Sequence, residues 1–216
     1  KNISGRIIAE AWSEDYIELE YQTTGPGRPP EVSVDYSGST MLIKAIYPKG
    51  PLNFATIHFE LKVPDTLKSL EAGTVSGAVE VSGLENTAQK LSTTSGAVKT
   101  DGSADIDISS VSGAVKFASS GDRIAAKTTS GGIKGELTED TGSGRIKISS
   151  VSGGVVLKIP GGMGADVDLH SVSGSVSSDF PVSVTESRNK TLKGRLGGGG
   201  TSIDVGTVSG SIKLSK

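Results

Sequence analysis

The stretch that decides the fold is Ser110-Val-Ser-Gly-Ala-Val115, because the chain repeats this pattern along most of its length. The pattern is Thr or Ser, any residue, Ser, Gly, a small residue, and then Val or Ile. The glycines of the clear copies are Gly77, Gly96, Gly113, Gly131, Gly153, Gly174 and Gly210. A degenerate copy, Lys193-Gly-Arg-Leu196, fills the one long gap, so the mean period is about 19 residues, which indicates a stacked repeat architecture.

Each repeat contains two short stretches with the alternation of a β-strand. Apolar residues alternate after the glycine, as at Val115 and Phe117, and before the next glycine, as at Ile146 and Ile148. A unit with two short strands buries its apolar side chains only when it is stacked on similar units. We therefore predict an all-β fold in which residues 67–216 form a β-solenoid of about eight or more coils, with like residues about 4.8 Å apart. The alternative is a β-sandwich or a β-propeller with two repeats in each blade.

The N-terminal third, residues 1–66, has a different composition. It holds seven of the nine aromatic residues, namely Trp12, Tyr16, Tyr21, Tyr36, Tyr47, Phe54 and Phe59. Several stretches in it have strand character, so we expect a β-rich region that caps one open end of the stack, as solenoids require. The alternative is an aromatic ligand surface, for which Trp12 and Tyr21 are the candidates.

These features together resemble the DUF4097 adhesin family of bacteria and archaea. The resemblance covers nearly the whole chain. It begins with Asn2-Ile-Ser-Gly-Arg-Ile-Ile8 and Trp12, and it continues through Phe59-Glu-Leu-Lys-Val-Pro64 and the Ser-Gly repeats. It ends with Leu196-Gly-Gly-Gly-Gly-Thr-Ser-Ile-Asp-Val-Gly-Thr-Val-Ser-Gly-Ser-Ile212. It implies a single-stranded, right-handed parallel β-helix in a cell-envelope or secreted protein. Some members of the family contribute to envelope-stress signalling, and the family has no catalytic residue to transfer to this chain.

Composition excludes several classes of protein. The 22 Lys and Arg residues nearly balance the 24 Asp and Glu residues, which argues against a nucleic-acid partner. The absence of Cys excludes disulfides and thiolate metal sites. No apolar run approaches the 18 or so residues of a transmembrane helix. The chain starts at Lys1 without Met, and a removed signal peptide or anchor would explain this start.

Residues with catalytic or metal-binding chemistry are few. The two histidines, His58 and His170, are far apart in sequence, and no nucleophile motif accompanies them. A polysaccharide-cleaving enzyme would need paired carboxylates, and the pairs are Asp105 with Asp107 and Asp166 with Asp168. Their spacing places them on outer strand faces, where we expect solvated side chains. The glycine-rich stretches 161–166 and 197–200 do not complete a calcium or phosphate motif. We predict no catalytic residue, no cofactor and no metal.

One outward position of the repeat, three residues after the glycine, carries Lys99, Lys116 and Lys134 in consecutive units. Stacking would align these lysines into a basic row that suits an anionic polymer. The alternative is that outward lysines only prevent sideways association of strands.

The sequence thus favours a non-enzymatic, extracytoplasmic β-helix that acts as an adhesin or scaffold and binds a cell-surface polysaccharide or an envelope protein. Contact with a membrane is expected only through a segment outside this sequence. The alternatives are a carbohydrate- or ligand-sensing module of the cell envelope and, less favoured, a polysaccharide-cleaving enzyme.

Overall fold

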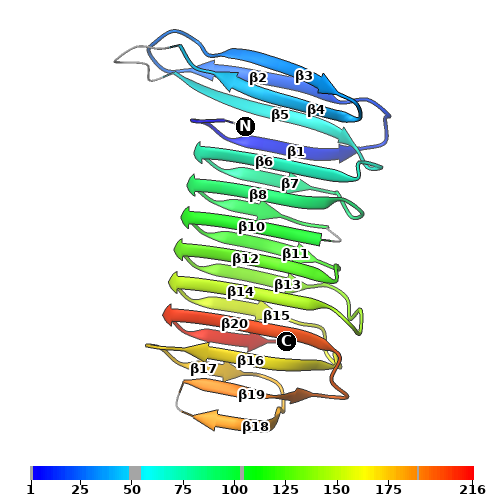
Figure 1. Cartoon of the computed structure of the whole chain (residues 1–216), viewed down its shortest axis with the longest axis vertical. Helices are drawn as coiled ribbons and strands as arrows, with labels where there is room; N and C mark the ends of the chain where they lie inside the picture. The colour runs from blue at the N-terminus through cyan, green and yellow to red at the C-terminus, as the bar shows by residue number, and fades with distance from the viewer. Residues whose placement is uncertain (1, 49–54, 103–104, 189) are drawn as a thin grey trace.

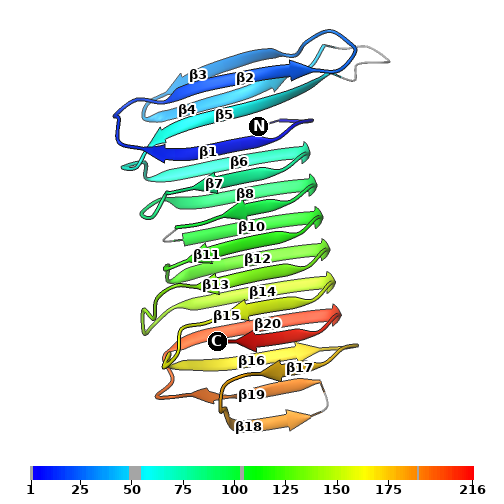
Figure 2. The same ribbon diagram turned by 180° about the vertical axis from the view of Figure 1, so that it is seen from behind.

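The computed structural model describes residues 2–48, 55–102, 105–188 and 190–216, so Phe54 lies outside the described residues. The described chain is all-β and consists of a ten-stranded sheet, a nine-stranded sheet and a two-stranded hairpin. The two large sheets face each other and run the length of an elongated stack (Figures 1 and 2). The prediction of an all-β, solenoid-like fold is confirmed.

The ten-stranded sheet forms one long face of the stack. In spatial order its strands are β17 (Val176–Ser178), β21 (Ile212–Ser215), β15 (Val155–Lys158), β13 (Ile133–Leu137), β11 (Val115–Ser119), β9 (Val98–Thr100), β7 (Val79–Ser82), β1 (Ile7–Trp12), β5 (Thr56–Pro64) and β2 (Glu18–Thr24). All neighbours in this sheet are parallel except β2, which pairs with β5 in the antiparallel direction.

The nine-stranded sheet forms the opposite face. In spatial order its strands are β18 (Ser183–Arg188), β19 (Thr191–Leu196), β16 (Ala165–Ser171), β20 (Thr201–Ser209), β14 (Arg145–Ser152), β12 (Arg123–Ser130), β10 (Asp105–Ser112), β8 (Ala88–Ser95) and β6 (Ser69–Ser76). Its strands from β16 to β6 are parallel, whereas β19 is antiparallel to both β16 and β18. Seven coils result, each with one strand in each sheet: β6/β7, β8/β9, β10/β11, β12/β13, β14/β15, β20/β21 and β16/β17.

The core lies between the two sheets and is built from rows of equivalent residues. Ile106, Ile124, Ile146 and Ile203 follow one another in register across four strands, and each is almost fully buried. The inward positions are therefore those that the sequence alternation predicted. Within a row, a large side chain is placed beside a small one. The Phe117 ring of β11 fills the space beside Gly135 of β13.

The recurrence of Ser-Gly in the repeat has a physical cause at the corner between the sheets. Corner glycines of adjacent coils touch, so a Cβ at Gly113 would collide with the carbonyl oxygen of Gly96. The Thr or Ser three residues before each glycine is buried, and in every copy except that of Ser110 its hydroxyl donates to the corner carbonyl of an adjacent coil. These bonds run from Thr74 to Gly5, Thr93 to Gly77, Thr128 to Gly113, Ser150 to Gly131, Ser171 to Gly210 and Thr207 to Gly153.

The N-terminal third continues the stack and then closes it. Strands β1 and β5 extend the ten-stranded sheet, and antiparallel β2 ends it. The hairpin of β3 (Glu31–Ser37) and β4 (Thr40–Ile46) packs beside β2 and β5 at this end (Figure 1). Its Val32, Ile43 and Ala45 contact the core. Residues 1–66 thus both extend and cover the solenoid.

The C-terminal end departs from the expected order of coils. After β14/β15 the chain skips one level, forms β16/β17 and the β18–β19 hairpin, and then returns to insert β20/β21 into the skipped level. The degenerate copy around Gly194 is therefore not a coil, because it lies in β19, which is antiparallel to β16. The prediction that this copy forms a coil is wrong. The first and last described strands, β1 and β21, both lie between other strands along the stack and not at its tips (Figure 1).

Candidate functional site

The three lysines of the predicted basic row are adjacent on the outer face of the ten-stranded sheet. Lys116 of β11 is in register with Lys99 of β9 on one side and with Lys134 of β13 on the other. All three side chains are exposed, whereas their sequence neighbours at positions 98, 115 and 133 are buried. We call Lys99, Lys116 and Lys134 the lysine row. Neighbouring strands in a sheet are about 4.8 Å apart, so three positive charges lie close together on one line.

The charges of the lysine row are not neutralised within the described part of the chain. No ion pair among those residues involves any of the three. The row ends at Glu80, in register with Lys99, and at Val156, in register with Lys134. The nearby Glu136 is already paired with Lys158 at 2.9 Å. Like charges at this spacing repel one another, so an anion that binds along the row lowers the electrostatic free energy.

Trp12 lies on the outer face of the ten-stranded sheet, near the N-terminal end of the stack. Its indole Nε1 donates to the carbonyl oxygen of Tyr16 at 2.9 Å, and the two rings meet edge to face at 4.6 Å. The Lys62 ammonium lies 5.4 Å from the indole centroid. Lys62 in turn donates to Glu18 at 2.6 Å, and this hydrogen bond raises the Lys62 pKa. The indole N–H of Trp12 therefore bonds to the β1–β2 connection, and Lys62 of β5 covers one face of its ring.

Tyr21 lies on the other face of the same sheet. It is in register with the buried Phe59, and the two ring centroids are 6.3 Å apart. Lys62, which contacts Trp12, is in register with Glu18, and Glu18 and Tyr21 are an odd number of residues apart on β2. Successive side chains of a strand point to opposite faces. The structure therefore does not bring Trp12 and Tyr21 together into one aromatic surface, although Tyr21 is 55% exposed.

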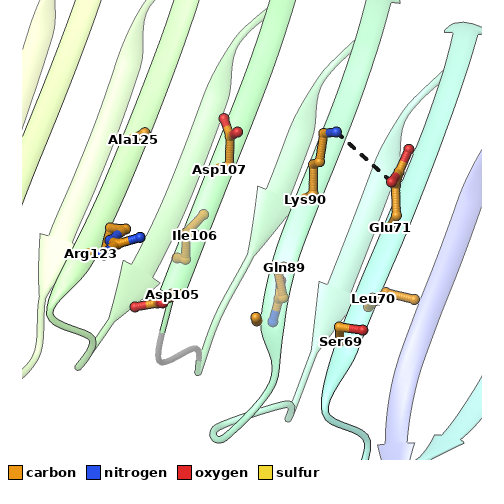
Figure 3. A pocket seen from close by; sticks show the side chains of 11 residues that line it. Ser69, Leu70, Glu71, Gln89, Lys90, Asp105, Ile106, Asp107, Arg123 and Ala125 are labelled. Atoms are coloured by element: carbon orange, nitrogen blue, oxygen red, sulfur yellow. Dashed lines mark ion pairs between the residues drawn. The ribbon is translucent and has the colours of Figure 1, made fainter.

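A shallow hollow of about 410 Å³ lies on the outer face of the nine-stranded sheet, across β6, β8, β10 and β12 (Figure 3). Short side chains at Ala88 and Ala125 leave the space, and charged side chains of both signs surround it. The charged residues are Glu71, Lys90, Asp105, Asp107 and Arg123. Lys90 and Glu71 form an ion pair at 3.9 Å.

Sequence reasoning missed this hollow, although the repeat contains a signal for it. Glu71, Lys90, Asp107 and Ala125 all stand six residues before a corner glycine, so stacking places them in one row. At this position successive repeats carry charges of alternating sign and then the small, uncharged Ala125. A comparison of the repeats at this one position would therefore have indicated the hollow.

The candidate carboxylate pairs have different surroundings. Asp105 and Asp107 both line the hollow. Asp166 accepts a hydrogen bond from Arg195 Nε at 2.9 Å, and this bond lowers its pKa. Asp168 pairs with Lys193 at 2.7 Å, and this contact raises the Lys193 pKa. Asp166 and Asp168 therefore act as ionic anchors between β16 and β19.

Other candidate chemistry is sparse in the described ranges. His58 Nδ1 accepts a hydrogen bond from the Arg6 backbone amide at 3.3 Å. His170 is on β16, far from His58 along the stack, and lies against Gly206 of the neighbouring strand β20. Among residues 2–48, 55–102, 105–188 and 190–216, no three His, Asp or Glu side chains are grouped as metal ligands. The same residues include no helix that is long and apolar enough to cross a membrane.

The sequence model of the Toastrack DUF4097 family matches residues 32–215, which is most of the chain. The chain belongs to the Toastrack DUF4097 family. The resemblance that the Ser-Gly repeats indicated is thereby confirmed. The Toastrack match includes the β3–β4 hairpin, every regular coil and the inserted coil β20/β21.

No curated protein matches the sequence of this Toastrack chain. A similar solved structure is the crystal structure of a "putative cell adhesion protein" from Clostridium sporogenes. The alignment covers 99% of this chain and 89% of that one, with 10% sequence identity and a TM-score of 0.44.

Proposed function

We propose that this protein is a non-enzymatic adhesive or scaffolding rod of the cell envelope, and that its lysine row binds an anionic surface polymer. The observation that carries the proposal is the in-register stacking of Lys99, Lys116 and Lys134 without ion-pair partners in the described chain. Membership of the Toastrack DUF4097 family supports a surface or adhesin-like role. The proposed location is extracytoplasmic.

The proposed form of the rod is a single-stranded, right-handed parallel β-helix. Strands such as β8 and β10 are parallel neighbours in one sheet and are joined by a crossover through the other sheet. Crossovers of this kind are right-handed in nearly all proteins. A rod of stacked coils presents its outer rows at a fixed spacing, so it suits a partner with regularly repeated charges.

The anionic class of partner follows from the lysine row itself. Three exposed ammonium groups on one line make a local positive field on a chain whose net charge is −2. Such a field attracts polyanions, and salt screens it over about 10 Å at 0.1 M ionic strength. Anionic cell-wall polymers and acidic polysaccharides share this chemistry. Hydroxyl-rich neutral polymers do not.

The experiment compares two triple variants in a pull-down or biolayer assay with immobilised teichoic acid, an acidic polysaccharide and neutral dextran. Lys99→Ser/Lys116→Ser/Lys134→Ser removes the lysine row. Lys127→Ser/Arg145→Ser/Lys147→Ser removes the same charge from exposed positions on the opposite sheet. We expect salt-sensitive binding to the anionic polymers that only the first variant loses. Equal loss in both variants, or binding to dextran alone, contradicts the proposal.

The carbohydrate-sensing alternative has less support from the geometry. It uses Trp12 and Tyr21, which lie on opposite faces of the sheet, so a single sugar ring cannot stack on both. A soluble oligosaccharide that binds the intact protein and is released by Trp12→Ala or Tyr21→Ala, but not by loss of the lysine row, would favour this alternative.

A further inference from the structure

The last coil, β20/β21, occupies a slot between two coils that precede it in the sequence. Strand β20 pairs in the parallel direction with β14 on one side and with β16 on the other, over seven residues each. Strand β21 pairs with β15 and with β17 in the same way. The residues that fill this level of the stack are thus the last to leave the ribosome among those described.

The cap beyond the slot depends on this coil for its attachment. The cap consists of β16, β17, β18 and β19, and none of these strands pairs with β14 or β15. Their ladder hydrogen bonds toward the body of the stack are made with β20 and β21. Among the described residues, the cap is also linked to the body of the stack by the covalent chain and by loop contacts such as the hydrogen bond from the Gly164 amide to Asp140. The slot therefore has two parallel strand edges on each side, all of which require partners.

The inserted coil fits the slot specifically. At Gly206 a Cβ would collide with the imidazole of His170 on β16. The Thr207 hydroxyl donates to the Gly153 carbonyl at 3.3 Å, and Lys213 pairs with Asp179 at 3.3 Å. All of these contacts are made between residues of the coil and residues of the two neighbouring levels of the stack. Any copy of residues 201–216 can make them, whichever chain supplies it.

A glycine hinge connects the cap to the coil. Leu196 of β19 and Thr201 of β20 both pair with Ala165, on its opposite sides, so they lie about two strand spacings or 9.6 Å apart. Gly197, Gly198, Gly199 and Gly200 span this gap. Gly197, Gly199 and Gly200 have positive φ, and a Cβ at Gly198 would meet nothing within 4 Å. The hinge is therefore exposed and is built from residues that adopt alternative backbone conformations readily.

We propose that the slot between β14/β15 and β16/β17 is a site for a second copy of this chain, and that two copies exchange residues 201–216 to form a dimer. Exchange preserves every contact of the coil and changes only the conformation of the hinge. The equilibrium between the monomer and the exchanged dimer then depends on the effective concentration of the coil at the slot of its own chain. A short flexible linker gives an effective concentration in the millimolar range, which favours the monomer in dilute solution.

The first experiment alters the hinge. Deletion of Gly197–Gly199 leaves two Cα steps between Leu196 and Thr201, which reach at most about 7 Å and cannot span the gap of about 9.6 Å. Gly200 is retained because a Cβ there would approach the Gly142 carbonyl. We expect size-exclusion chromatography with light scattering to show the deletion variant mainly as a dimer and the intact chain mainly as a monomer. A control with two extra glycines after Gly198 should remain monomeric.

The second experiment identifies which chain supplies the coil, and it uses the absence of native cysteine. Ser152 and Ser209 are exposed and in register on β14 and β20. Chains with Ser152→Cys are refolded together with chains that carry Ser209→Cys, at high concentration and in the hinge-deleted background. A disulfide between the two chains forms readily only if the coil of one occupies the slot of the other. Ser95→Cys replaces Ser152→Cys in the control, since Ser95 of β8 lies four strand spacings, about 19 Å, from the position that Ser209 occupies in the slot.

The expected result is a disulfide-linked heterodimer with Ser152→Cys in large excess over the Ser95→Cys control. Two results would overturn the proposal. One is a hinge-deleted chain that stays monomeric at all concentrations. The other is a dimer in which both cysteine pairs cross-link equally, since this dimer would be formed by some other surface. Neither result bears on polymer binding, because the lysine row lies on β9, β11 and β13, outside the slot.

Discussion

At the scale of single residues, the repeat is explained by two features of one corner. The glycine is required because the backbone of the adjacent coil occupies the place where a Cβ would lie. The buried hydroxyl three residues earlier donates to a corner carbonyl that accepts no hydrogen bond from the strand ladder. Both features could be inferred only in part from the sequence. The pattern marked these positions as special, but it did not say which atoms they touch.

The corner glycine gives the first prediction. Gly113→Ala should destabilise the protein by about 1–3 kcal/mol, because the new methyl group collides with the Gly96 backbone, which cannot move without disturbing the stack. Gly161→Ala is the matched control, since a Cβ there meets nothing within 4 Å and the residue does not have a positive φ. Its effect should stay within about 0.5 kcal/mol. Urea unfolding of the two variants measures the difference, and equal effects would contradict the explanation.

The corner hydroxyls give the second prediction. Ser150 and Ser110 occupy the same buried position in different coils, but only Ser150 has a described partner, the Gly131 carbonyl at 3.2 Å. Ser150→Ala should therefore cost about 1 kcal/mol. Ser110→Ala should be neutral or stabilising, because it removes a desolvated hydroxyl that is unpaired among the described residues. Unfolding free energies in urea test this order, and a larger cost at Ser110 would refute it.

At the scale of strands, the parallel rows were predictable and the pairing directions were not. Equal offsets from a glycine predicted which residues stack, and Lys99, Lys116 and Lys134 lie in register as those offsets require. The alternation in β2 gave no information about its direction or about which face it shares with β1, so the placement of Trp12 and Tyr21 on opposite faces could not be foreseen. Similarly, Lys193-Gly-Arg-Leu196 has the spacing of a repeat, but its strand is antiparallel.

The antiparallel strand β19 leads to a prediction about pH. Arg195 lowers the pKa of Asp166, so this ion pair stabilises the cap at and above neutral pH. The contribution is lost as pH falls below the ordinary aspartate value of about 3.9 and through the lowered pKa of the folded state. Asp168 raises the pKa of Lys193, so that pair contributes below about pH 10.4 and is lost as pH rises through the raised value.

Hydrogen-exchange protection factors of the β19 amides, corrected for intrinsic rates at each pH, measure this effect. They should decrease as the pH falls below the ordinary aspartate pKa of about 3.9 and through the lowered pKa of Asp166. Amides of β12, which lie four strands from β19, provide the internal control and should keep their protection. In Asp166→Asn the β19 amides should be less protected at pH 7 and should depend less on pH. An unchanged pH profile in this variant would rule out the Asp166–Arg195 pair as the cause.

At the scale of the whole molecule, the stack is modular, because each interior coil contacts only the coils beside it. The register from β10 to β12 and from β12 to β14 is the same, so an additional unit between them meets matching neighbours on both sides. The length of the rod is thus set by the number of units, as in other repeat proteins.

Modularity gives the last prediction. A second copy of residues 113–130, inserted after Ser130, should fold as an extra coil and lengthen the particle by about 4.8 Å. The maximum dimension from small-angle X-ray scattering measures the change, and the melting temperature should not fall. An 18-residue Gly/Ser insertion at the same place should form a loop and leave the regular stack no longer. If both insertions give the same scattering profile, the coils are not independent modules.

The antiparallel strands at the two extremities have a consequence for growth. A bare parallel coil at either tip would offer an open template on which further molecules could pile up without limit. Here antiparallel β2 ends the ten-stranded sheet at one tip, and antiparallel β19 with β18 ends the nine-stranded sheet at the other. A second molecule that meets either of these antiparallel ends finds no parallel strand edge like its own, which disfavours continuation of the sheet from one molecule to the next.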